Sequence, residues 1–162
     1  MKNKIILIKF FLLLLIITSC NSSDTRIVKI TPPEYLQLIK KIKKKTIIHY
    51  WFSYCTPCIR DFPELMKICK EENINLINIS NDTSDGKMQK NLEKVMKKLN
   101  ISDCYIIDSK YLYPSGEVRF VLGDFAKQVG QIEYNNPFYI LIDENGNKII
   151  ETSKLELLKN KI

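Results

Sequence analysis

The sequence predicts a single α/β domain, and three observations favour this fold class. Segments rich in β-branched and aromatic residues alternate along the chain with segments whose apolar residues recur at helical spacing. One segment, residues 46–52, is continuously apolar, which is typical of a central strand buried on both faces. The length of 162 residues and the hydrophobic content of 45% suit one core and exclude a disordered chain.

Six segments have the pattern of strands. Residues 26–30 alternate in polarity, whereas the later segments are short apolar runs rich in Ile, Leu, Val and aromatic residues. Asn145-Gly146 lies between the last two segments and is a hairpin signal, so these two strands are expected to be neighbours. In chain order, the expected strands are residues 26–30, 46–52, 74–79, 104–107, 138–142 and 148–151.

Five segments have the pattern of helices. Thr31 can cap the first, which Pro32 and Pro33 can open. Ser84 can cap the third, whose apolar residues share one face, and Gly130 is a stop signal after the fourth. In chain order, the expected helices are residues 31–42, about 56–72, 84–99, 117–129 and 152–161.

The net charge of +7 does not indicate a nucleic-acid partner. Lys2, Lys4 and Lys9 lie in a segment expected to be removed, which leaves 25 − 3 = 22 basic residues against 18 acidic ones, or +4. Only three of the basic residues are arginines, and arginine is the residue that base recognition favours. The lysine-rich run at 40–45 could meet lipid headgroups, but the favoured interpretation is the solvated end of a helix.

The N-terminal residues 1–19 have the pattern of a secretory signal peptide, with a basic head, an apolar run at 10–17 and small residues at its end. A buried N-terminal helix is the alternative. The tetrapeptide Ile17-Thr18-Ser19-Cys20 resembles the lipobox of bacterial lipoproteins. This resemblance implies a mature chain lipidated at Cys20, with residues 20–25 as a short tether, facing the oxidising periplasmic side of an envelope membrane. Asn21 follows Cys20 directly, which favours an outer-membrane location under the best-known bacterial sorting rule, but the choice of membrane stays open.

The motif Cys55-Thr56-Pro57-Cys58 lies where a buried strand ends and a helix begins. Backbone N–H groups and the positive end of the helix dipole favour a thiolate at such a position. Two intervening residues let the two sulfurs join in a small ring, so one thiol can attack a substrate disulfide and the other can resolve the mixed disulfide. Pro57 suits the first helical turn, where a missing N–H costs nothing.

Two other interpretations of the cysteine pair are a zinc site and a purely structural disulfide. Zinc needs two further ligands, but Cys69 lies about 16 Å further along the same helix, and the chain has one histidine and no second C-x-x-C. We therefore expect no metal and no bound cofactor, since a redox disulfide carries its own electrons.

The segment Trp51-Phe52-Ser53-Tyr54-Cys55-Thr56-Pro57-Cys58-Ile59-Arg60-Asp61-Phe62-Pro63 resembles the active-site segment of thioredoxin-fold proteins. It is most similar to that of the TlpA-like thiol:disulfide oxidoreductases of bacterial envelopes. Asn136-Pro137 and the ending Asp143 to Gly146 are similar too, so the resemblance covers most of residues 26–162. It implies a thioredoxin-like three-layer sandwich with a central mixed sheet flanked by helices. It further implies that Cys55 is the exposed nucleophile, that Cys58 resolves, and that Pro137 is cis and packs against the disulfide.

The implied function is that of a monomeric, lipid-anchored oxidoreductase, expected to be a reductase, that exchanges disulfides with envelope proteins and is recharged by an upstream thiol donor. A lipoprotein that binds a partner through an unreactive, locked disulfide is the alternative from another class. A redoxin-type thiol peroxidase ranks lower, because the P-x-x-x-T-x-x-C frame of those enzymes is absent around Cys55.

Two titratable residues were expected to support the cysteine pair. Asp61 lies three residues after Cys58, and the family usually has an acid there, which implies a proton acceptor that tunes the thiol pKa; an acid favoured by the helix dipole alone is the alternative. His49 could relay protons to Cys58, although a hydrogen-bonded structural histidine is the favoured interpretation. Trp51, Pro57 and Asn136 complete the expected surroundings.

Of the two further cysteines, only Cys69 is expected to be an inert thiol, and the sequence assigns no role to Cys104. Cys69 continues the face of Cys58 at helical spacing, through Phe62 and Leu65, which predicts a buried thiol in the core. Cys104 is expected to be buried as well or, as the alternative, to be paired with Cys69.

Overall fold

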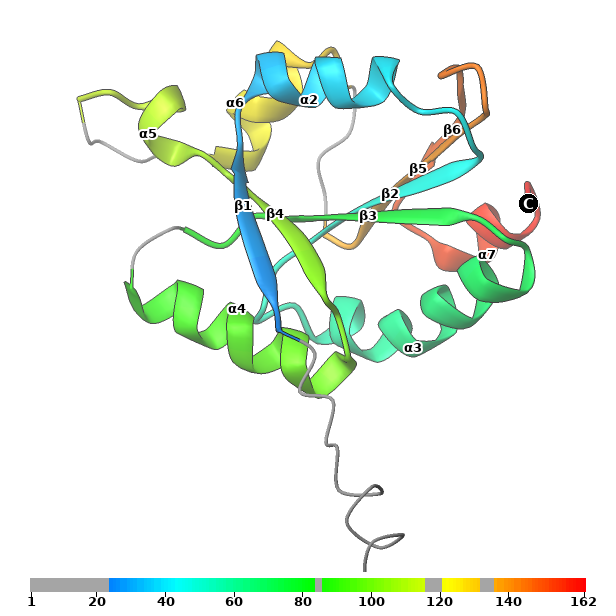
Figure 1. Ribbon diagram of the computed structural model, residues 1–162, viewed down its shortest axis with the longest axis horizontal. Coiled ribbons are helices and arrows are strands. Elements are labelled where there is room, and N and C mark those ends of the chain that lie inside the picture. Colours follow the sequence, from blue (N-terminus) through cyan, green and yellow to red (C-terminus); the bar gives the residue numbers. More distant parts are fainter. Residues whose placement is uncertain (1–23, 84–85, 116–120, 132–135) are drawn as a thin grey trace, which may run out of the picture.

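The computed structural model describes residues 24–83, 86–115, 121–131 and 136–162 as a three-layer α/β sandwich around one mixed six-stranded sheet (Figure 1). The strands are β1 (Arg26–Ile30), β2 (Thr46–Trp51), β3 (Asn75–Ser80), β4 (Asp103–Ile107), β5 (Phe138–Ile142) and β6 (Lys148–Thr152). The helices are α2 (Pro32–Lys40), α3 (Thr56–Glu71), α4 (Gly86–Leu99), α5 (Ser109–Leu112), α6 (Val121–Gln128) and α7 (Leu155–Lys159). All six expected strands are confirmed, with bounds that differ by one residue at most.

The strand order β1-β4-β3-β2-β5-β6 decides where the functional residues lie. β1, β4, β3 and β2 pair in parallel, so their carboxyl ends meet at one edge of the sheet. β5 pairs antiparallel with β2, and β6 antiparallel with β5. Cys55 follows the carboxyl end of β2, whereas Arg26 is the first residue of β1. The cysteine motif therefore lies at the carboxyl ends of the parallel strands, and β1 begins nearer their amino ends.

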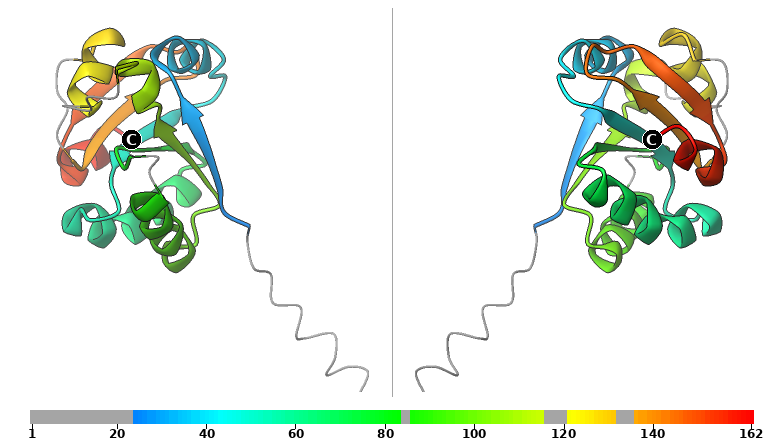
Figure 2. Two further views of the ribbon diagram at one scale, coloured as in Figure 1. Left: turned by 90° about the vertical axis from the view of Figure 1, so that its left-hand side faces the viewer. Right: turned by 90° about the vertical axis from the view of Figure 1, so that its right-hand side faces the viewer.

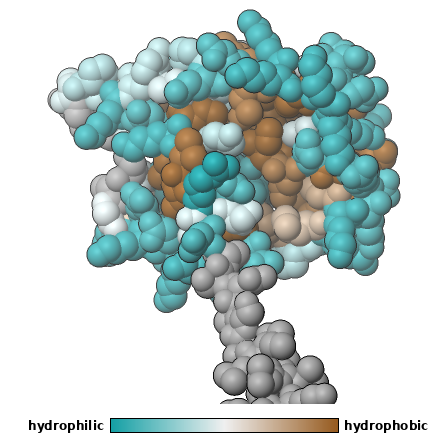
Figure 3. Space-filling view, viewed as in Figure 1, coloured by the Kyte–Doolittle hydropathy of each residue, from teal (hydrophilic) through white to brown (hydrophobic). Residues whose placement is uncertain are grey.

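Helices cover both faces of the sheet, as the two side views of Figure 2 show, and core side chains pack on both faces. Along β2 the side chains alternate, and all six residues of the strand are buried. Ile48 and Tyr50 pack with α2 and α6 on one face. Ile47 and Trp51 belong to the opposite face, which α3, α4 and α7 cover. Apolar atoms are also visible between the upper and lower helices in Figure 3, where edge strand β1 is uncovered.

The first and last helices are shorter than expected. α2 ends at Lys40, because the N–H groups of Lys41 and Ile42 turn back to the carbonyls of Leu38 and Ile39, each at 3.1 Å. The lysine-rich run is therefore mostly the connection to β2, and Ile42 is buried in the core instead of continuing the helix. The last helix begins only at Leu155, since the preceding strand β6 continues to Thr152.

Other differences concern the segment between β4 and β5. Asp108 caps the short helix α5, which the sequence did not predict, by accepting a hydrogen bond from the Lys110 N–H at 3.0 Å. α6 corresponds to the helix expected at 117–129, whose first four residues lie outside the described residues. Gly130 ends that helix with a φ of 74°, as expected for a left-handed stop. Gly146 has a φ of 87° in the hairpin between β5 and β6.

The N-terminal predictions concern a part of the chain that lies outside the described residues. This applies to the signal peptide at 1–19, to Cys20 and to most of the tether; Ser84, the expected cap of α4, is also outside. Within the described ranges, no helix has the length and apolar character needed to cross a membrane.

Candidate functional site

Cys55 and Cys58 form a disulfide at the first turn of α3, with their Cα atoms 5.2 Å apart. Cys55 is the N-cap of the helix, and its Sγ accepts a hydrogen bond from the Cys58 N–H at 3.2 Å. Pro57 lies within the first turn, where no intrahelical partner for its nitrogen is needed. The same N–H that contacts the disulfide sulfur is therefore in place to stabilise a Cys55 thiolate after reduction.

The disulfide is nearly closed to solvent. Cys55 is 4% exposed and Cys58 is completely buried, so the opening at Cys55 is narrower than the resemblance implied. Tyr54, directly before Cys55, is 54% exposed and forms part of the surrounding surface. A surface pocket of about 340 Å³ lies beside the motif, and both Pro57 and Pro137 line it.

The Asn136-Pro137 peptide bond is cis, as the resemblance implied. Pro137 immediately precedes β5, which pairs with β2, so the sheet brings Pro137 to the same end of the molecule as the cysteine motif. The Oδ1 atom of Asn136 is buried and has no hydrogen-bond partner among the described residues.

A buried carboxylate holds the loop that leads to Cys55. Asp82 is fully buried, and it accepts hydrogen bonds from the Ser53 N–H (2.8 Å), the Ser53 hydroxyl (2.8 Å) and the Ser80 hydroxyl (2.6 Å). Asn91 of α4 donates a further bond, at 2.7 Å, to the Ser53 hydroxyl. Ser53 lies two residues before Cys55, so this network fixes the backbone that positions the Cys55 sulfur.

Sequence reasoning missed this network, because its members are far apart along the chain. Ser53 and Asp82 are separated by 29 residues, and Ser53 and Asn91 by 38. Each residue alone has the pattern of an ordinary loop or helix surface position. A polar residue at the end of each of two neighbouring parallel strands was the only available signal.

Asp61 lies in the lining of the pocket that contains Pro57 and Pro137. Its Oδ1 accepts a hydrogen bond from the Arg60 Nε at 2.7 Å, and its side chain remains 20% exposed. The negative charge of Asp61 also acts on His49, whose pKa it raises against the larger effect of burial. Asp61 therefore lies in the pocket beside the cysteine motif, and its role as a proton acceptor stays a prediction.

His49 is completely buried on the face of β2 that α3 covers. Its ring stacks on Tyr139, its partner on β5, with the ring centroids 5.0 Å apart, and also on Trp51 at 6.3 Å. Burial lowers the pKa of His49 to about 3, although Asn78, its partner on β3, and Asp61 both raise it. The imidazole is therefore neutral at neutral pH.

The expectation of a hydrogen-bonded structural histidine is only partly met. The Asn78 side chain lies within electrostatic reach of the His49 ring, but neither ring nitrogen completes a hydrogen bond of normal geometry within the described residues. Aromatic stacking, including Phe62 at 5.4 Å, surrounds the ring instead. Packing with the neighbouring rings therefore determines its position.

The remaining described cysteines, Cys69 and Cys104, are buried and free, so the alternative of a disulfide between them is wrong. Burial raises the pKa of the Cys69 thiol to about 11 and that of Cys104 to about 12. Among the residues that the structure describes, no group of His, Cys, Asp or Glu side chains could hold a metal ion.

The three-dimensional arrangement is shared with solved bacterial proteins. The thioredoxin domain of a thiol-disulfide oxidoreductase from Bacteroides vulgatus superposes with a TM-score of 0.54 and 17% identity, covering 77% of this chain and 79% of that one. The chain has the thioredoxin fold. A thiol-disulfide oxidoreductase from Bacteroides fragilis gives a TM-score of 0.53 and 21% identity, covering 75% of this chain and 81% of that one.

StoA from Bacillus subtilis gives a TM-score of 0.50 and 23% identity, covering 75% of this chain and 84% of its own. No protein-family model matches the chain, and no curated protein matches it in sequence. At such low identities the likeness establishes the fold, and the chemistry has to be argued from the cysteine site itself.

We expect the buried thiols to be unreactive in the native protein. In the mature protein, reduced and then treated with iodoacetamide at about pH 8, Cys69 and Cys104 should react at least about 100-fold more slowly than Cys55, since only a small fraction of each is thiolate. Peptide mass spectrometry gives the rates, and all three thiols should react in denaturant. Labelling of native Cys104 as fast as Cys55 would contradict the burial described above.

We expect His49 to make the fold sensitive to acid. Its folded-state pKa is about 3 against an ordinary 6.5, so the unfolded chain binds the extra proton and stability falls as pH drops from 6.5 towards 3. Between about pH 7.5 and about pH 5 the oxidised protein should lose about 2 kcal/mol more unfolding free energy than the His49→Leu variant. Urea unfolding at both pH values measures the difference. His49 is the only histidine of the chain, so equal losses would show that its ring can be protonated in the folded state.

We expect Asp82 to stabilise the fold through the Ser53 loop. Asp82→Ala leaves three buried donors without their acceptor and should lower the free energy of unfolding by roughly 3 kcal/mol. Asp82→Asn keeps one acceptor oxygen and should lose less. The control is Asp103→Ala, which removes an exposed ion pair with Arg26 and should cost under about 1 kcal/mol. Similar losses for Asp82→Ala and Asp103→Ala in urea unfolding would refute this assignment.

Proposed function

We propose that the protein is a membrane-anchored thiol–disulfide oxidoreductase of the bacterial envelope that reduces disulfides of other proteins. One observation carries the proposal: a disulfide-bonded Cys55–Cys58 pair caps α3 at the end of the central strand of a thioredoxin fold. The pocket walled by Pro57 and the cis Pro137 lies beside the pair and gives a polypeptide substrate a surface to contact. Solved proteins named thiol-disulfide oxidoreductases share the fold.

The reaction is a pair of thiol–disulfide exchanges. The Cys55 thiolate attacks one sulfur of the substrate disulfide, which forms a mixed disulfide and releases the other substrate sulfur as a thiolate. Cys58 then loses its proton, to Asp61 in this proposal, and attacks the Cys55 sulfur. The second substrate thiolate leaves, and the Cys55–Cys58 disulfide is restored. Two electrons pass to the substrate, whose two sulfurs take up protons, and a separate dithiol donor must reduce the pair for the next cycle.

The surroundings of Cys55 favour the direction of a reductase. A strong oxidant requires a reduced form that is strongly stabilised, usually through a low-pKa thiolate. Among the described residues, the Cys58 N–H donates the one hydrogen bond to the Cys55 sulfur, and the buried Asp82 side chain holds the nearby loop. Arg60, one turn further along α3, is engaged by Asp61. This limited stabilisation of a Cys55 thiolate supports a reduction potential of the cysteine pair near that of thioredoxin.

The anchoring part of the proposal rests on Cys20. Lipidation there would leave a tether of only a few residues before β1 begins at Arg26. Since β1 begins at its amino end and Cys55 follows the carboxyl end of β2, the anchor would hold the domain at a different point from its cysteine pair. The pair would then face the periplasmic side, where disulfide-containing proteins are found.

A redox titration of the mature protein, with the thiols trapped by alkylation, tests the proposed activity. Cys55 and Cys58 should show one two-electron transition near thioredoxin's potential of about −270 mV, and the matched Cys104→Ser variant should titrate identically. In cells, Cys58→Ser should accumulate mixed disulfides with envelope proteins because the resolving thiol is missing. Cys55→Ser should accumulate none.

Two results would overturn this function. A potential near about −120 mV would indicate that the protein donates disulfides instead of reducing them. A pair that shows no transition, with Cys55 resistant to alkylation after chemical reduction, would exclude the enzyme and favour a binding lipoprotein with a locked disulfide.

A further inference from the structure

Helix α4 holds the whole net charge of the mature chain. It carries five lysines and one glutamate, a balance of +4, and the chain from Cys20 onwards also has a balance of +4. The remaining residues from Cys20 onwards therefore contain 22 − 5 = 17 basic and 18 − 1 = 17 acidic side chains. Residues 40–45 also hold five lysines, mostly in the connection to β2, so α4 is the helix with the largest positive excess and not the only basic segment.

The lysines of α4 form one stripe on its outer face. With 3.6 residues per turn, all five fall within an arc of roughly 100°. The buried residues Leu92 and Met96 lie on the opposite side, against the core. All five lysine side chains are exposed, and none forms an ion pair with another described residue. The lysines of the stripe are Lys87, Lys90, Lys94, Lys97 and Lys98.

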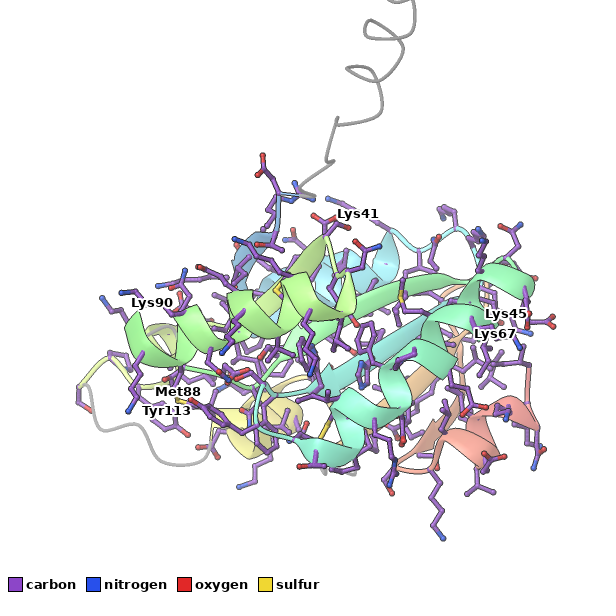
Figure 4. All side chains as sticks on the ribbon, turned by 90° about the horizontal axis from the view of Figure 1, so that it is seen from below. Lys41, Lys45, Lys67, Met88, Lys90 and Tyr113 are labelled. Atoms are coloured by element: carbon purple, nitrogen blue, oxygen red, sulfur yellow. A yellow bond between two sulfur atoms is a disulfide. The ribbon has the colours of Figure 1, made fainter. Side chains whose placement is uncertain are left out.

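The neighbouring helix α3 shows the more usual arrangement of surface charge. Lys67 pairs with Glu71 at 3.8 Å, and Glu64 pairs with Lys159 of α7 at 2.7 Å. α3 and α4 cover the same face of the sheet, which Figure 4 shows from below, with Lys90 on α4 and Lys67 on α3. The uncompensated charge is therefore specific to α4 and does not extend over the whole face.

The stripe lies beside the place where the chain enters the domain. The N–H of Arg26 donates a hydrogen bond to the carbonyl of Ser102 at 2.7 Å, and Ser102 is three residues beyond the end of α4. The six steps from Cys20 to Arg26 span at most about 20 Å, and α4 itself is about 20 Å long. A membrane that holds Cys20 is thus within reach of the helix.

We propose that the lysine stripe of α4 binds the anionic headgroups of the membrane in which Cys20 is anchored, and so fixes the orientation of the domain. This inference rests on the anchoring proposed above. A short tether keeps the lysines close to the surface, where each is worth about fivefold in binding. An acidic protein is the other possible counterpart of such a stripe, but the short tether favours the membrane, because it would keep the membrane near α4.

Contact through the outer face of α4 leaves the pocket beside the cysteine pair uncovered. The pocket beside the disulfide is lined by residues of α3, by Pro137 and by the segment from Ser153 to Glu156, and α4 contributes none of its lining. Headgroup contact along the stripe would therefore leave that pocket uncovered.

The test uses the mature lipidated protein reconstituted in vesicles of phosphatidylcholine, with or without phosphatidylglycerol. An amine-reactive reagent is applied, and labelling of each lysine is measured by peptide mass spectrometry. With phosphatidylglycerol present, the stripe lysines should react at least about fivefold more slowly, while Lys67 and Lys70 of α3 keep their rates. High salt should abolish the protection, because it screens charges beyond a few ångströms.

A charge-reversal variant and a matched control complete the design. Lys90→Glu/Lys94→Glu/Lys97→Glu should remove the protection of Lys87 and Lys98. The control Lys29→Glu/Lys40→Glu/Lys110→Glu changes the net charge equally at exposed positions outside α4 and should retain it.

The two proposals fail in different ways. Protein that does not float with phosphatidylcholine vesicles and whose Cys20 peptide carries no lipid would refute the anchor. Protein that floats, but whose stripe lysines react equally on both vesicles, would refute membrane contact through α4 and leave an acidic protein as its counterpart.

Discussion

The complete burial of β2 is the constraint on which the rest of the structure depends. All six residues of this strand are buried, and it is hydrogen-bonded to β3 on one side and to β5 on the other. A strand so enclosed cannot shift its register without moving apolar side chains on two faces at once. Cys55 follows from the end of this fixed strand, and Pro137 arrives through its partner β5. The geometry of the cysteine site is thus inherited from the sheet and not from a flexible loop.

The same burial determines the protonation state of His49. A charged imidazole in this position would lose its hydration, and the surrounding rings of Trp51, Tyr139 and Phe62 would stabilise its charge only weakly. Asp61 and Asn78 favour the charged form, but burial outweighs both, so the pKa falls to about 3. From the sequence, a histidine near a cysteine pair suggests proton transfer. In the structure it behaves at neutral pH as an aromatic residue of the core.

Much of the fold could be predicted because its signals are local. Alternating polarity identified β1 and apolar runs identified the other five strands. Gly130 and Gly146 marked a helix end and a hairpin, and both have positive φ angles in the structure. The end of α2 was missed because Ile42 continues the helical spacing but is buried after the helix has closed. Asp82 was missed for a different reason. It acquires its partners only when parallel strands place Ser53 and Ser80 side by side, and no window of sequence contains that arrangement.

The direction of the strands also links chemistry to location. The parallel strands carry Cys55 to their carboxyl ends, whereas Arg26 is the first residue of β1, so the cysteine pair and the proposed point of attachment are separate places on the domain. A tether of a few residues would let the domain rotate about that point, but it could not move far from the surface. With the domain so restricted, the lysine stripe of α4, which ends near Arg26, would strengthen binding to an anionic membrane surface. Each contact with an anionic surface costs little further entropy, because the tether has already confined the helix.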